Sequence, residues 1–171
     1  SCIDSGGHHT QQVYAFCKTR THRKIYAIKG QSQSNKPIAG RPSYIGRARN
    51  ILFPVGTDTA KEFIYSRLKA EEETIHFPAT VDEEYFMQLT AEKRIIKYVK
   101  GRKKFEWVKK NTRNEALDTF VYALAGLYIL QPNYNKLEHA INNFKSNNTD
   151  HKKVMQKNSN IKRTDWINSW K

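Results

Sequence analysis

The segment Glu115–Leu130 constrains the fold of this chain more than any other part of it. Its residues have helical spacing, and from Phe120 onward they are apolar on nearly every side. We expect a helix that is buried in a protein core, ends before Pro132 and is too short to cross a membrane. A helix of this kind needs a folded domain around it. The chain has 171 residues, of which 38% are hydrophobic, and this is enough for one domain with a sizeable core.

Composition excludes three classes of protein. Two cysteines, Cys2 and Cys17, are too few for a disulfide framework, no apolar run is long enough for a membrane span, and 12% aromatic residues argue against a disordered chain. No signal peptide is visible, so we expect an intracellular protein. The net charge of +14 favours a polyanionic partner, of which nucleic acid is the most common.

Strand-like and helix-like segments alternate along the chain, which predicts an α/β fold with a mixed sheet. The predicted strands are 1–4, 24–29 and 51–55. The predicted helices are one that Thr10 can cap, with Val13, Phe16 and Cys17 at helical spacing, and two further helices at 59–69 and 81–92. Residues 30–50 are rich in Gly, Ser, Asn and Pro and are interpreted as a surface loop. In such a fold the working site lies at the carboxyl ends of the strands.

The chain divides into a folded domain over residues 1–135 and a basic, partly flexible tail over residues 136–171. Residues 145–163 lose all periodicity and are rich in Asn, Lys and Ser, and an aromatic segment at 165–170 is interpreted as docking back onto the protein.

Asp118 is the most informative carboxylate, because it lies near the start of the most hydrophobic helix. A carboxylate in that position is costly unless it is solvated, paired or bound to a metal ion. It is equally compatible with a first-turn acid that the helix dipole stabilises. Glu115 lies on the same helix face, but Thr112-x-x-Glu115 also matches a capping box.

Asp4 and Asp58 each follow a short apolar strand and precede a helix. Asp4 opens Asp-Ser-Gly-Gly, where glycines allow a ligand to approach, although a turn aspartate bound to its own backbone is the slightly favoured alternative. Asp58 could likewise be a helix N-cap. Lys61, three residues later, could contact a phosphate or could simply be solvated.

Carboxylates near strand ends in a very basic protein indicate a site for a hard cation. Mg²⁺ and Mn²⁺ prefer oxygen ligands, and two such ions can activate a water and stabilise the leaving oxygen during phosphodiester cleavage. His8 and His9 have no Cys-x-x-Cys or His-x-x-x-His beside them, so we interpret them as a polar turn rather than a zinc site.

Residues 95–109 are typical of a hairpin around Lys100-Gly101-Arg102, with aromatic residues alternating with basic ones. We expect the aromatic side chains to lie in the core and the basic side chains to face DNA. The alternative is an amphipathic hairpin whose lysines are merely solvated. The predicted DNA contacts are Lys61, Lys97, Lys100, Arg102, Lys103, Lys104 and Arg113.

Four motifs in one order carry a resemblance to a known family. They are C-I-D-S-G-G-H-H-T at the start of Cys2–Cys17, V-G-T-D-T-A-K-E (Val55–Glu62), H-F-P (His76–Pro78) and R-N-E-A-L-D at the start of Arg113–Ala125. Over roughly residues 1–130 the chain resembles the C-terminal nuclease domain of the phage large terminase subunit of the GpA type. The resemblance implies a ribonuclease-H-like fold, a mixed sheet flanked by helices, and two bound Mg²⁺ or Mn²⁺ ions.

The resemblance also implies an activity and its residues. Asp4 and Asp118 match the metal-binding, catalytic aspartates of the family, and Asp58 matches a further motif and is added as a catalytic candidate beside Lys61. The implied activity is metal-dependent cutting of concatemeric viral DNA in the host cytoplasm. The implied partners are double-stranded DNA, the terminase ATPase domain, the small terminase subunit and the portal, with no membrane.

Family nuclease domains begin with a strand that carries another acidic metal ligand. That strand would precede Ser1, so we expect this chain to lack the N-terminal strands of the fold and, alone, to bind metal weakly and cut poorly. Two alternatives to the nuclease are a non-enzymatic DNA-binding or assembly module and a related ribonuclease-H-like resolvase or transposase. The module predicts salt-sensitive DNA binding without cleavage.

Overall fold

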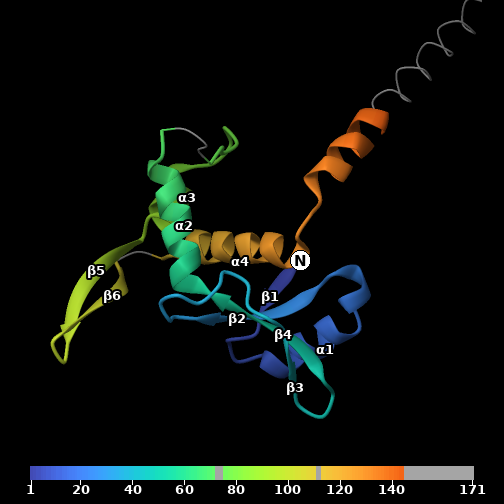
Figure 1. Ribbon diagram of the computed structural model, residues 1–171, viewed down its shortest axis with the longest axis horizontal. Helices are drawn as coiled ribbons and strands as arrows, with labels where there is room; N and C mark the ends of the chain where they lie inside the picture. Colours follow the sequence, from blue (N-terminus) through green and yellow to red (C-terminus); the bar gives the residue numbers. More distant parts are fainter. Residues whose placement is uncertain (72–74, 111–112, 145–171) are drawn as a thin grey trace, which may run out of the picture. The chain divides into compact units, whose positions relative to one another are not determined.

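The computed structural model describes residues 1–71, 75–110 and 113–144 (Figure 1). The chain divides into two compact units, Ser1–Leu130 and Gln131–Lys171. In the second unit residues 134–144 are helical. The predicted tail at 145–163, the aromatic segment at 165–170 and Thr112 of the capping box lie outside the described residues.

A four-stranded mixed sheet forms the centre of the first unit, as predicted. Its strands lie in the order β1-β2-β4-β3. Their bounds are β1 Cys2–Asp4, β2 Tyr26–Gln31, β3 Ser43–Ile45 and β4 Asn50–Gly56. Strands β1, β2 and β4 are parallel, with Asp4 opposite Ile28 and Ile28 opposite Phe53, and β3 is antiparallel to β4. The carboxyl ends of β1, β2 and β4 therefore meet at one edge of the sheet.

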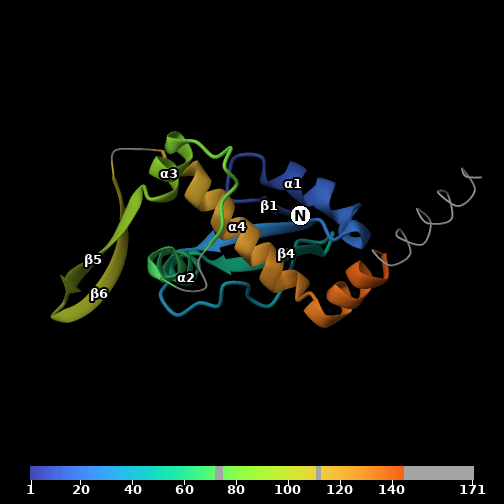
Figure 2. The same ribbon diagram turned by 90° about the horizontal axis from the view of Figure 1, so that it is seen from above.

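Helices cover both faces of this sheet (Figure 2). They are α1 Thr10–Lys18, α2 Thr57–Lys69, α3 Glu83–Leu89 and α4 Glu115–Leu130, with a 3₁₀ turn at Thr21–Arg23. On one face Ala27 and Leu52 pack in a core cluster with buried side chains of α1. On the other face Ile28 and Val55 pack with α2, α3 and α4. This alternation follows from the two-residue period of a strand, and it gives the layered α/β architecture that the sequence predicts.

The predicted hairpin is confirmed and is longer than expected. Among the residues that the structure describes, strands β5 (Glu92–Val99) and β6 (Arg102–Lys109) pair only with each other, in a separate two-stranded sheet. Lys100 and Gly101 turn the chain with positive φ values of 51° and 74°. The expectation that its aromatic residues lie in the core is mostly wrong, because Tyr98 is 75% exposed and Phe105 is 37% exposed. The base of the hairpin packs against α2, with the Trp107 ring 5.1 Å from that of Tyr65.

Four further expectations need correction. The loop at 30–50 contains strand β3, because three of its residues pair with β4. The helix predicted to reach Glu92 ends at Leu89, and Glu92 begins β5. The hydroxyl of Thr10 bonds to the carbonyl of Ser5 at 2.8 Å and does not cap α1.

The last of the four concerns α4, which is buried on one face only. Leu117, Val121 and Ala125 repeat every four residues and are at most 1% exposed, whereas Leu127 and Leu130 are 43% and 47% exposed.

Candidate functional site

The carboxyl edge of the sheet gathers the charged side chains that the sequence singled out. Asp4 is the last residue of β1, Asp58 is the second residue of α2 directly after β4, and Asp118 lies in the first turn of α4. Figure 2 shows β2 and β4 pointing toward the start of α2 and the hairpin. We name the following residues the carboxyl-end cluster: Asp4, Asp58, Lys61, Glu92, Asn114, Asp118 and Tyr122.

Asp4 and Asp118 both lie near Tyr122. Burial, the negative charges of Asp4 and Asp118, and a hydrogen bond with Asp4 together raise the pKa of the Tyr122 phenol to about 12. Both carboxylates therefore act on the same phenol. Sequence reasoning missed Tyr122, although its position one helical turn after Asp118 on α4 is a signal that could have found it.

The loop after β1 holds Asp4 in place. The backbone N–H of Gly6 donates to Asp4 Oδ1 at 2.9 Å, so the turn-aspartate interpretation describes the local structure. Ser5 is buried, and its hydroxyl donates to the carbonyl of Ile28 on β2 at 2.8 Å. Asp4 itself remains exposed, so it is accessible to a ligand.

A chain of short contacts connects Asp118 to α2 and to the hairpin. Asn114 Nδ2 donates to Asp118 Oδ2 at 3.0 Å and to Glu92 Oε1 at 2.9 Å. Glu92 Oε2 is 2.7 Å from Lys61 Nζ, and these two side chains are only 7% and 12% exposed. Lys61 was predicted as a DNA contact and is instead ion-paired in this structure; a role toward DNA stays a prediction.

Glu92 and Asn114 are residues that sequence reasoning missed. Glu92 follows the buried residues Leu89 and Ala91, a position where a carboxylate needs a partner. Asn114 lies one helical turn before Asp118, in the R-N-E-A-L-D motif. Both could have been found by asking which polar side chains can hydrogen-bond to, or form an ion pair with, a buried carboxylate.

The electrostatic environment disfavours the charged form of Asp118. Burial raises the pKa of its carboxyl, and Lys61 lowers it. The charges of Glu92 and Glu115 raise this pKa again. The same effects act on Asp58, whose pKa burial raises most and Lys61 lowers. Asp58 is not the N-cap of α2, because Gly56 occupies that position.

Beside Asp58 a cavity of about 270 Å³ opens between α2 and the hairpin. Its lining residues carry both charges and include two aromatic side chains: Ser32, Asp58, Lys61, Glu92, Lys104, Phe105, Glu106, Trp107 and Lys109. Of the predicted DNA contacts, only Lys61 and Lys104 line it.

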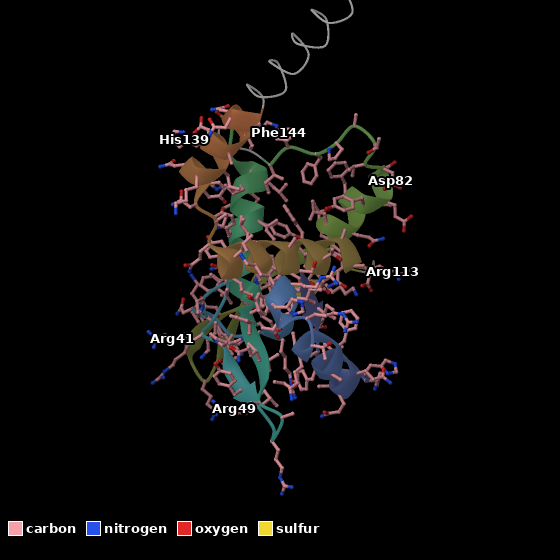
Figure 3. All side chains as sticks on the ribbon, turned by 90° about the vertical axis from the view of Figure 1, so that its right-hand side faces the viewer. Arg41, Arg49, Asp82, Arg113, His139 and Phe144 are labelled. Atoms are coloured by element: carbon pink, nitrogen blue, oxygen red, sulfur yellow. The ribbon has the colours of Figure 1, made fainter. Side chains whose placement is uncertain are left out.

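The other predicted DNA contacts lie on the hairpin and before α4. Lys97 is paired with Glu106 at 2.9 Å, and Lys103 Nζ lies 5.5 Å from the centre of the Phe105 ring. Lys100 and Arg102 are exposed at the tip of the hairpin. Arg113 is exposed beside the start of α4 (Figure 3).

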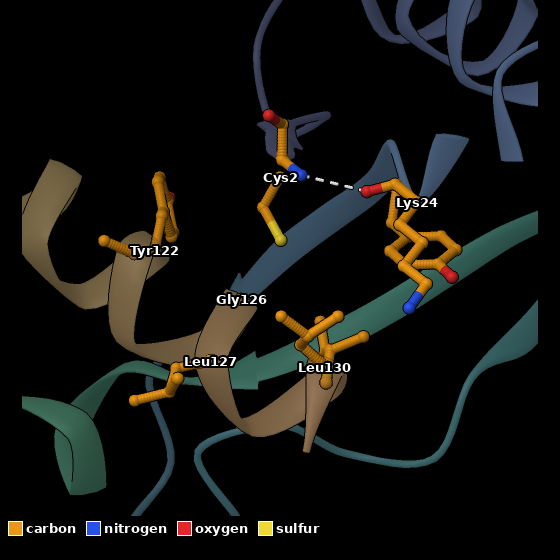
Figure 4. A pocket seen from close by; sticks show the side chains of 10 residues that line it. Cys2, Lys24, Tyr122, Gly126, Leu127 and Leu130 are labelled. Atoms are coloured by element: carbon orange, nitrogen blue, oxygen red, sulfur yellow. Dashed lines mark hydrogen bonds between the residues drawn. The ribbon is translucent and has the colours of Figure 1, made fainter. Parts of the chain in front are cut away.

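A second cavity, of about 450 Å³, borders Tyr122 but contains no carboxylate (Figure 4). It lies between β1 and the last turns of α4, and its labelled residues include Cys2, Gly126 and Leu130. Its lining is mainly apolar, so it is not a site for a cation.

The donor chemistry of the carboxyl-end cluster fits a hard cation. Asp4 and Asp118 offer carboxylate oxygens, and Mg²⁺ is commonly held by one or two carboxylates together with water and substrate phosphate. The negative charges of Glu92 and Glu115 repel the Asp118 carboxylate and raise its pKa. A bound cation would offset this repulsion. Within residues 1–71, 75–110 and 113–144, no group of three or more His, Cys, Asp or Glu side chains is placed to hold a metal ion.

No helix in the described part of the chain is long and apolar enough to cross a membrane.

Comparisons with known proteins agree with the motifs. The model of a family described as "Terminase large subunit gpA, endonuclease domain" matches residues 1–140. The chain is similar to the terminase large subunit of Escherichia phage lambda, with 42% identity over 138 residues, and to that of Enterobacteria phage P21, with 38% identity over 141 residues. Each match covers 75% of this chain but 22% of the relative. No solved structure is significantly similar.

Proposed function

The chain belongs to the endonuclease-domain family of the gpA terminase large subunit, and from this membership we propose that it is a divalent-metal-dependent DNA endonuclease that cuts concatemeric viral DNA during genome packaging. It spans 22% of the length of the curated relatives that it matches. The activity of a whole terminase is therefore a proposal for this chain.

The observation that carries the proposal is the placement of both Asp4 and Asp118 near Tyr122, at the carboxyl edge of the sheet. These two aspartates are 114 positions apart in the sequence, yet both charges raise the pKa of one phenol. They lie at the edge where α/β sheets place their working sites. Two nearby carboxylates in a chain with a net charge of +14 are suited to an acidic metal site within a surface that attracts DNA.

We propose that Asp4 and Asp118 hold Mg²⁺ or Mn²⁺, and that the pair of ions implied by the resemblance is completed with substrate phosphate and water. The ions would polarise the scissile phosphate, activate the attacking water and stabilise the leaving oxygen. Asn114 orients the Asp118 carboxylate through the 3.0 Å hydrogen bond, while Lys61 balances the charge of Glu92 behind it. Asp58 lines the neighbouring cavity and is the third catalytic candidate.

The hairpin is the proposed grip on double-stranded DNA. Its exposed basic residues Lys97, Lys100, Arg102, Lys103 and Lys104, together with Arg113, can neutralise backbone phosphates. The exposed ring of Tyr98 offers a face on which an unpaired base can stack. Further proposed partners are the terminase ATPase domain, the small terminase subunit and the portal, in the cytoplasm of the bacterial host.

Plasmid nicking tests this proposal. Because the chain alone is expected to bind metal weakly and cut poorly, we expect it to nick supercoiled DNA slowly with Mn²⁺ or Mg²⁺ and to lose this activity in EDTA. The isosteric change Asp118→Asn should abolish nicking while leaving the circular dichroism spectrum and DNA binding intact. Glu83→Gln, which neutralises an exposed acid in the first turn of α3, is the matched control and should cut like the parent chain.

Two results would replace the proposal. Salt-sensitive DNA binding with no cleavage under any divalent metal would assign a DNA-binding or assembly module. Selective cutting of branched junctions, or strand transfer, would assign a resolvase or transposase. Nicking by Asp118→Asn at the rate of the parent chain would contradict the proposed site.

A further inference from the structure

An acid-free segment occupies nearly a third of the chain. Between Asp4 and Asp58 there is no Asp or Glu, while nine Lys and Arg residues occur there. The basic residues of the hairpin are interrupted by acids, but this segment carries only positive charge.

Topology brings part of this charge to the edge of the sheet opposite the carboxyl-end cluster. The connection from α1 to β2 and the turn from β3 to β4 both lie at the amino ends of the parallel strands. Ile25 and Ile45 pack against the same small core cluster, so the two connections are neighbours. We name the basic residues of these two connections the amino-end basic surface: Arg20, Arg23, Lys24, Arg47 and Arg49.

The amino-end basic surface is open to solvent. All of its members except Arg20, which is half-buried, are exposed. In the described part of the chain none of the five forms an ion pair, whereas Lys61, Arg94 and Lys97 each have a carboxylate partner. Figure 3 shows Arg49 at the β3–β4 turn, far from Arg113 beside α4.

Aromatic rings support two of the arginines. The guanidinium of Arg20 lies 3.9 Å from the centre of the Phe16 ring, and that of Arg49 lies 5.0 Å from the Tyr44 ring. Tyr44 is 60% exposed, so it presents a ring face beside a cation. Arg20 Nη1 also donates to the carbonyl of Phe16 at 3.1 Å and to Thr19 Oγ1 at 2.9 Å, so part of its guanidinium is already engaged. Stacking restrains the guanidinium of Arg49 without using its hydrogen-bond donors.

We propose that the amino-end basic surface is a second contact site for duplex DNA, separate from the cleavage site. Four of its five members are arginines, whose planar fork of donors matches phosphate oxygens. They lie on two neighbouring connections at one edge of the sheet, an arrangement that suits a backbone of repeated phosphates. The seven residues of β4 separate this surface from the carboxyl-end cluster by about 20 Å. The choice of DNA as the polyanion rests on the proposed function.

The test compares two charge-matched double variants. Arg23→Gln with Arg49→Gln removes one cation from each connection, and Lys69→Gln with Lys136→Gln removes two exposed cations elsewhere. Affinity for a fluorescent duplex is measured without divalent metal from about 50 to about 200 mM salt. The arginine variant should bind at least about tenfold more weakly at low salt, and its salt slope should be smaller by about 0.9 for each phosphate that it no longer neutralises.

The lysine control should keep the slope of the parent chain. Equal slopes for both variants would overturn the inference, and so would a polyglutamate peptide that displaces DNA from the parent chain as efficiently as unlabelled duplex does. Thermal melting confirms that both variants fold. Since binding is measured without metal, a parent chain that binds through these arginines yet never cuts would contradict the proposed function and leave this inference standing.

Discussion

Glu92 connects side chains of the candidate site that come from different parts of the fold. One of its oxygens accepts from Asn114 at 2.9 Å, and the other pairs with Lys61 at 2.7 Å. Asn114 in turn donates to Asp118. A shift of the Glu92 side chain would therefore move Asp118, the proposed metal ligand, through Asn114 alone. The contribution of the Glu92–Lys61 ion pair to stability is the first quantity to measure.

Lys61→Met should destabilise the protein strongly, because it leaves the Glu92 carboxylate buried without a counter-charge. Breaking a buried pair by removing one partner costs about 3 kcal/mol in the free energy of unfolding, measured by urea denaturation. Glu92→Gln in the same chain should recover most of this loss, since the amide keeps an acceptor for Asn114.

Lys97→Met is the matched control for that experiment. Its pair with Glu106 has a similar length, 2.9 Å, but the two side chains are 49% and 42% exposed. Its loss should be below about 1 kcal/mol. Equal losses for Lys61→Met and Lys97→Met would contradict the view that Glu92 is held by Lys61.

The raised pKa of Asp118 predicts a pH dependence of stability. Burial and the charges of Glu92 and Glu115 make the folded chain bind this proton more tightly than the unfolded chain does. As pH rises from the ordinary carboxyl pKa of 3.8 through the raised native value, the folded state loses stability. Asp118→Asn removes this loss, so its stability advantage over the parent chain should grow with pH.

Urea unfolding at a series of pH values without divalent metal measures this difference. A constant difference between Asp118→Asn and the parent chain across the acidic range would show that the environment of Asp118 does not disfavour its charge.

At the residue scale the sequence singled out Asp4 and Asp118, which both lie near Tyr122, but not the groups around them. Asp4 and Asp118 stand in motifs that can be recognised along the chain. The roles of Glu92 and Asn114 depend on contacts between residues 22 positions apart, and no local pattern carries that information. The sequence also predicts that α3 reaches Glu92, because the pairing of Glu92 in β5 is equally invisible in a local pattern.

Among the secondary-structure elements, the junction between β4 and α2 positions Asp58 and depends on a glycine. A Cβ atom at Gly56 would lie 2.5 Å from the carbonyl oxygens of both Lys36 and Pro37. These are backbone atoms, so the loop that carries them would have to move. The backbone N–H of Gly56 also donates to the carbonyl of Pro37 at 3.0 Å.

Gly56→Ala should therefore lower the free energy of unfolding by about 1–3 kcal/mol. Gly7→Ala is the control, since nothing lies within 4 Å of a Cβ at that position. The two variants can be compared by urea denaturation of the chain without metal. Losses of the same size in both would contradict the close approach of the 36–37 backbone to Gly56.

Secondary-structure elements with a strong period were predicted well, and elements held by distant partners were not. The periodic patterns of α2, β4 and the hairpin indicated each of them. Strand β3 was missed because its three residues, Ser43–Ile45, become a strand only by pairing with β4. The exposure of Tyr98 was missed because alternation indicates which residues share a face, whereas packing decides whether that face is covered.

At the scale of the whole first unit, acidic and basic side chains gather at opposite ends of the central sheet. The carboxyl ends of the parallel strands lead to acids that suit a cation, and the amino ends carry only basic connections. The net charge of +14 therefore has a spatial order that composition alone does not show. Under the proposed function, DNA attracted by that charge would be cut where the acids hold a metal ion, so the proposal depends on the metal site.

A crystal structure of the chain soaked in Mn²⁺, with anomalous scattering to locate the ion, tests this claim most directly. We expect Mn²⁺ to be bound by the carboxylates of Asp4 and Asp118, with no ion at that place in Asp118→Asn crystals soaked in the same way. Mn²⁺ bound elsewhere, or the two aspartates without an ion in the soaked parent crystal, would contradict it.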